Sequence, residues 1–173
     1  MSAVNVLSTQ LRERKRTTPE SQAQRTFLDF CVDGRSLYDL LNRDCVSGVA
    51  DKQPASISVE FLERLKLATE ADFPNNRRSL YVCAECGDLG CGAVSIAVAA
   101  KDGVVVWEDF GYENKYEDEV IREGYEFIGP FRFNADAYAA VLEEAEKEAS
   151  QLAAPVEKVQ LNPLLSAVKR IFR

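Results

Sequence analysis

Three cysteines and three glycines crowd the segment 83–92, whose sequence is CAECGDLGCG. Thiolates at this spacing are ligands for a soft metal ion such as zinc, and a C-x2-C pair can also perform disulfide chemistry. Glycines lack a Cβ, so they let the backbone turn sharply between the thiols. Cys83, Cys86 and Cys91 are therefore the residues whose type and spacing favour chemistry most.

Three interpretations of this segment are open. A structural zinc site usually has four ligands, and the chain has no histidine to complete the set. The candidates for a fourth ligand are Cys31, Cys45, Glu85 and Asp88. A redox C-x2-C pair normally opens a helix, whereas glycines and a strand-like segment follow here. We favour a tight connection whose reduced cysteines pack as small hydrophobic side chains, with no cofactor required and zinc as the alternative.

The composition argues against most catalytic sites. Without histidine there is no Ser-His-Asp or Cys-His catalysis and no usual side chain for proton transfer near neutral pH. The glycines of 87–92 do not match a phosphate loop, because no Lys-Ser/Thr pair and no helix follow them. We therefore assign no catalytic residues and expect a binding protein rather than an enzyme.

A second segment, 107–126, interleaves carboxylates with aromatic side chains. Tyrosine and tryptophan are favoured anchors of protein interfaces, and carboxylates around them steer basic surfaces into contact. The carboxylates lack the spacing of an EF-hand calcium site, and nothing in their pattern indicates the catalytic carboxylate pair of a glycosidase. The alternative to a partner interface is a solvated acidic face. The residues that we predict to bind a partner are Asp109, Tyr112, Glu113, Tyr116, Glu117, Asp118 and Glu119.

The charge distribution indicates the kind of partner. The chain has a net charge of −7, and residues 27–155 hold 12 basic against 25 acidic side chains. Such a body repels nucleic acid and attracts a basic protein. In bacteria the commonest role of this kind is an immunity protein that neutralises a basic toxin. The alternative function is a metal-binding or thiol-redox protein centred on Cys83, Cys86 and Cys91.

Two segments carry a resemblance. The sequence YVCAECGDLGCGA at 81–93 and VWEDFGYEN at 106–114 resemble a family of uncharacterised bacterial proteins that share the cysteine loop and a W-x-D-F segment. The resemblance implies a bacterial origin and supplies no catalytic residues.

The hydrophobic pattern predicts a single α+β domain with a mainly antiparallel sheet. We expect strands at 26–32, 80–83, 93–99, 104–110 and 131–133, with a hairpin turn at Asp102-Gly103. Helices are expected after Ser36, over 58–71 and over 135–152. We divide the chain into a polar basic tail (1–25), an acidic domain (26–154) and a docked amphipathic helix (155–173). No membrane span or signal peptide is expected, and five cysteines without a framework favour the cytoplasm.

Overall fold

The computed structural model describes residues 3–14 and 24–153. Two antiparallel sheets form one α+β domain, which confirms the predicted fold class. The smaller sheet contains β1 (Leu7–Glu13), β2 (Thr26–Val32) and β3 (Arg35–Ser36), in that order. The larger sheet follows the chain order and contains β4 (Cys45–Ser47), β5 (Arg77–Cys83), β6 (Ala93–Lys101), β7 (Val104–Glu113) and β8 (Phe131–Asn134).

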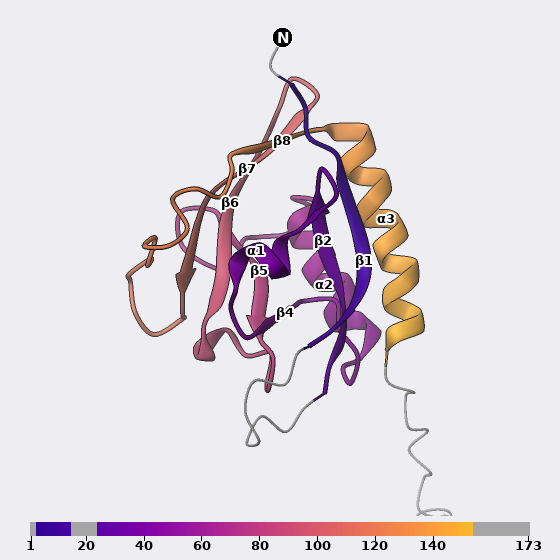
Figure 1. Ribbon diagram of the computed structural model, residues 1–173, viewed down its shortest axis with the longest axis vertical. Helices are drawn as coiled ribbons and strands as arrows, with labels where there is room; N and C mark the ends of the chain where they lie inside the picture. Colours follow the sequence, from indigo (N-terminus) through magenta and orange to yellow (C-terminus); the bar gives the residue numbers. More distant parts are fainter. Residues whose placement is uncertain (1–2, 15–23, 154–173) are drawn as a thin grey trace, which may run out of the picture.

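The described helices are short except for the last one. They are α1 (Leu37–Leu41), α2 (Ala55–Leu65), the single 3-10 turn η1 (Leu89–Cys91) and α3 (Ala135–Leu152). Figure 1 shows α3 beside β1 and β2 on one side of the molecule, with β6 and β7 on the other. Two caps were predictable, since the Ser36 and Asn134 side chains accept backbone N–H bonds at the starts of α1 and α3.

The core lies between the two sheets. Phe30 of β2 makes edge-to-face ring contacts with Trp107 of β7 and Tyr81 of β5, at centroid distances of 5.7 and 6.4 Å. The Trp107 indole N–H donates to the Tyr138 hydroxyl at 3.1 Å, which ties β7 to α3. These aromatic side chains are buried, so the large sheet is a rigid base for the loops at its ends.

Several boundaries differ from the sequence prediction. Leu7–Glu13 is a strand paired with β2 rather than part of a polar tail. The second helix covers Ala55–Leu65 rather than 58–71, because Leu67 adopts a left-handed φ of 63° that ends the helix. β3 and β4 were not predicted, and β5 begins at Arg77 rather than at residue 80. The proposed helix at 155–173 lies outside the described residues.

Candidate metal centre and the adjoining acidic loop

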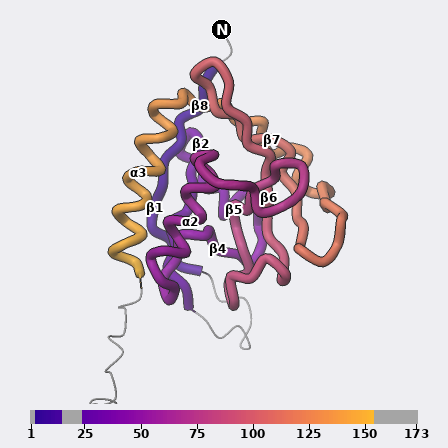
Figure 2. The backbone as a smooth tube through the Cα atoms, turned by 180° about the vertical axis from the view of Figure 1, so that it is seen from behind, coloured from indigo at the N-terminus to yellow at the C-terminus, as the bar shows by residue number. Residues whose placement is uncertain are grey.

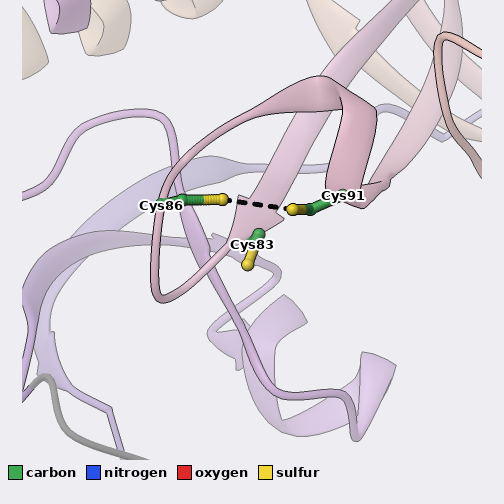
Figure 3. Close-up of side chains that lie close together, drawn as sticks. All are labelled: Cys83, Cys86 and Cys91. Atoms are coloured by element: carbon green, nitrogen blue, oxygen red, sulfur yellow. Dashed lines mark hydrogen bonds between the residues drawn. The ribbon is translucent and has the colours of Figure 1, made fainter.

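The three cysteines of the loop converge. Their Sγ atoms all lie within 4.8 Å of one another. Cys83 ends β5, Cys86 lies in the following turn and Cys91 ends η1. Figure 3 shows Cys86 and Cys91 pointing toward each other, with Cys83 close by. The spacing that singled these residues out in the sequence therefore gathers three thiols at one point.

Local backbone bonds shape this cysteine loop, residues 83–92. The Gly87 amide donates to the Cys83 carbonyl at 2.9 Å, and the Asp88 side chain accepts from the Gly90 amide. Gly92 closes η1 by donating to the Leu89 carbonyl at 3.1 Å. Gly87 and Gly92 have positive φ values of 67° and 102°, which side chains with a Cβ rarely adopt. The glycines thus curl the chain so that Cys86 faces Cys91.

Exposure of the thiols corrects the sequence interpretation. Cys86 and Cys91 are exposed and Cys83 is partly exposed, so they do not pack as buried hydrophobic side chains. All three are free cysteines. The other two cysteines, Cys31 and Cys45, are the buried ones, and burial raises the pKa of the Cys45 thiol to about 12.

Hydrogen bonding distinguishes the two facing thiols. Their Sγ atoms lie 3.3 Å apart. The Asp88 backbone N–H donates to the Cys86 sulfur at 3.4 Å, and this bond lowers the pKa of Cys86. The hydrogen bond with Cys86 raises the pKa of Cys91 to about 11. Of the two facing thiols, Cys86 therefore loses its proton more readily than Cys91.

The donor set suits a soft metal ion. With Zn–S bonds of about 2.3 Å, a tetrahedral ion holds its sulfur ligands about 3.8 Å apart, close to the spacing here. None of the four residues suggested as a fourth ligand belongs to the group, as the described residues place only these three cysteines together. Glu85 instead binds Arg14, and the Asp88 carboxylate binds the Gly90 amide. The described residues thus offer three ligands, and water or another molecule would fill the fourth position around an ion.

A small cavity adjoins the cysteines. Its volume is about 80 Å³, and Cys83 and Cys91 both line it together with Asp44 and Tyr112. The Asp44 carboxylate is bound by the Arg14 guanidinium at 2.5 Å. The cavity therefore has both polar and apolar walls, and its carboxylate is already paired.

Two of the predicted partner-binding carboxylates have structural contacts. Glu113 is buried and binds Arg77 Nε at 2.7 Å, while Asp109 binds Arg77 Nη1 at 2.5 Å. Arg122 holds the other side of Asp109, and these guanidinium contacts lower the pKa of the Asp109 carboxyl. Arg77 itself is only 2% exposed and also donates to Ser95. Asp109 and Glu113 therefore neutralise a buried arginine inside the large sheet.

Sequence reasoning missed Arg77. It opens β5 three residues before the start that we predicted, and its partners lie 32 and 36 residues later on β7. Nothing in the local pattern indicates that a charged residue there is buried. A register shift between β6 and β7, with Asp109 at a φ of 52°, accompanies this pairing.

Tyr112 is also engaged with the protein itself. Its hydroxyl donates to the Cys91 carbonyl at 2.8 Å, and the Arg43 guanidinium lies 3.8 Å from the centre of its ring. The Tyr112 side chain therefore stabilises the cysteine loop, and its hydroxyl and ring are already in contact with Cys91 and Arg43.

The other four predicted residues form an exposed loop, residues 114–119, which we call the acidic loop. Tyr116 is 84% exposed, and Glu117, Asp118 and Glu119 are exposed beside it. The Asn114 side chain accepts from the amides of Tyr116 and Glu117, so the loop begins with a defined turn. Further along the same connection, Phe127 is 96% exposed and was not among our predicted residues. Figure 2 shows this connection projecting on the side opposite α3.

Comparisons with protein-family models, curated proteins and solved structures found no match to the chain. Across the described ranges 3–14 and 24–153, none of the helices has the length and apolar character needed to cross a membrane.

Proposed function

We propose that this protein is a metal-binding protein whose site is Cys83, Cys86 and Cys91 and whose ion is zinc. The observation that carries the proposal is the convergence of three Sγ atoms within 4.8 Å on exposed or partly exposed side chains. Thiolates are strong zinc ligands, and the site lies at the surface, where an ion can enter. The ion would cross-link the end of β5, the turn and η1, and a water molecule or a partner group would complete its coordination.

Metal content tests the proposal. Protein purified without chelators is expected to contain about one zinc per chain by elemental analysis, and Cys86→Ser and Cys91→Ser variants are expected to lose it. Cys31→Ala is the matched control, because Cys31 is a buried cysteine on β2 outside the thiol group. The proposal fails if wild-type protein supplied with zinc stays metal-free, or if all three variants retain the ion equally.

A second candidate function is the neutralisation of a basic protein, such as a bacterial toxin domain. It is favoured by one specific observation, the 84% exposure of Tyr116 within a run of exposed carboxylates. An aromatic side chain surrounded by like charges is suited to anchor a partner that the charges attract. Glu117, Asp118 and Glu119 would steer the partner, whereas Asp109 and Glu113 would contribute only through the fold.

Charge reversal tests this second function. Replacing Glu117, Asp118 and Glu119 by lysine is expected to abolish capture of a basic protein from the native host. A control variant carries lysine at Glu70, Glu143 and Glu144, which are exposed and distant in sequence, so that the net charge changes equally. Equal capture by both variants would show that overall charge, and not this loop, attracts the partner.

A further inference from the structure

The cysteine loop and the acidic loop are bonded to each other. The Lys115 amide donates to the Leu89 carbonyl at 3.3 Å, and the Tyr112 hydroxyl donates to the Cys91 carbonyl at 2.8 Å. Both acceptors belong to η1, the turn that ends in a candidate metal ligand. The position of η1 therefore determines where two bonds of the neighbouring segment can form.

The two loops are also in van der Waals contact through Tyr116 and Gly90. A Cβ added at Gly90 would lie 2.7 Å from the Tyr116 ring, so the ring rests directly on the glycine backbone of the cysteine loop. Tyr116 remains 84% exposed on its other sides. The exposed Tyr116 side chain thus lies against the segment between Cys86 and Cys91.

The acidic loop has few other attachments. Tyr112 and Ile121 exchange two backbone bonds of 2.8 Å that close its base. The amides of Tyr116 and Glu117 donate to the Asn114 side chain, within the loop. In the region that the structure describes, the Lys115 amide is the backbone link between residues 115–119 and another segment. Movement of η1 would release that link.

We infer that metal binding by Cys83, Cys86 and Cys91 holds the acidic loop in place, so that Tyr116 and its carboxylates form a defined surface only in the metal-loaded protein. This inference rests on the proposed zinc site. Ligation fixes Cys86 and Cys91 to one ion, and it thereby fixes the Leu89 and Cys91 carbonyls that the neighbouring segment bonds. Loss of the ion leaves η1 held by its own turn bonds and by the bonds from the Tyr112 hydroxyl and the Lys115 amide.

Amide hydrogen exchange measured by NMR tests the inference, with zinc alone as the ligand. In the wild type, zinc is expected to slow exchange of the Lys115 amide at least tenfold and to leave amides in α3 unchanged. Tyr112→Phe keeps all three cysteines but removes the bond to Cys91. It is expected to bind one zinc and to show a clearly smaller slowing at Lys115.

The outcomes separate the two proposals. If zinc binds stoichiometrically and exchange at Lys115 does not change, the coupling is wrong while the metal site stands. If protection rises equally in α3, the ion stabilises the whole domain and the coupling is again wrong. If no zinc binds, both the site and the coupling are refuted.

Discussion

Gly92 determines the shape of the cysteine loop at the residue scale. Its φ of 102° and ψ of 155° lie in a region that is essentially restricted to glycine. An added Cβ would lie 2.0 Å from the Tyr112 hydroxyl, which itself bonds the Cys91 carbonyl. Gly92 therefore has a backbone conformation that other residues rarely adopt, and it lies in close contact with Tyr112. Both features lie next to Cys91, a candidate metal ligand.

Gly92→Ala is expected to destabilise the protein by about 1–3 kcal/mol from backbone strain alone, with a further loss from displacing Tyr112. Gly87→Ala is the matched control, because Gly87 has a φ of 67° but open space around it. It is expected to cost about 1 kcal/mol. Urea unfolding of the metal-free variants measures both, and equal midpoints would contradict the tight contact with Tyr112.

Asp109 gives the protein a pH-dependent contribution to stability. Arg122 and Arg77 lower the pKa of its carboxyl in the folded state. A folded-state pKa below the unfolded value near 3.9 contributes stability above about pH 4, and this stability is lost as the pH falls through the folded value. The contribution is thus present at pH 7 and absent in strong acid.

Asp109→Asn is therefore expected to lower the urea midpoint of metal-free protein at pH 7 and to differ little from wild type near pH 2. Asparagine tolerates the left-handed φ of 52° at this position, so the backbone is kept. Asp118→Asn, in the exposed loop, serves as the control. A midpoint difference that stays constant from pH 7 to pH 2 would show that the ion pairs are not its cause.

The sequence predicts proximity of the three thiols better than their exposure. Short spacing and glycines bring Cys83, Cys86 and Cys91 together, but burial depends on what packs over a loop. The paired roles of Asp109 and Glu113 depend on Arg77, which the fold brings from another strand. Long-range partners of this kind leave no local pattern in the chain.

At the scale of elements, the predicted strands and α3 correspond closely to those observed. Alternating side chains predict β6, the Asp102-Gly103 turn predicts β7 as the returning strand, and Asn134 marks the start of α3. β1 was misassigned because its sequence, LSTQLRE, is mostly polar, which is typical of an edge strand with one solvated face. β4 has three residues and offers too short a pattern to detect.

Deleting residues 1–13 tests the importance of β1. The deletion exposes one edge of β2, whose residues Phe27, Leu28 and Phe30 are buried, and removes the Arg12–Asp39 ion pair. We expect the melting temperature to fall by at least about 8 °C. In a domain of this size a loss of 1 kcal/mol shifts the melting temperature by roughly 2–4 °C, so this fall corresponds to a loss of about 2–4 kcal/mol. Deletion of residues 1–4 is the control, and an unchanged melting temperature for both proteins would contradict a stabilising strand.

At the scale of the whole molecule, two antiparallel sheets present the cysteine loop and the acidic loop side by side on one acidic domain. The large sheet fixes β5 through Arg77 and fixes β7 through Trp107, so the strands that lead into both loops are rigid. The loops themselves depend on each other through Tyr112 and Lys115. Because the two loops are bonded to each other, a metal ion at the three thiols would affect both of them.

X-ray absorption at the zinc K-edge tests that occupancy most directly, on the full chain purified without chelator and supplied with one equivalent of zinc. We expect three sulfur neighbours at about 2.3 Å and one lighter atom at about 2.0 Å. Loss of sulfur scattering in Cys86→Ser would assign the shell to this site. A first shell made only of nitrogen and oxygen neighbours would refute zinc binding by Cys83, Cys86 and Cys91.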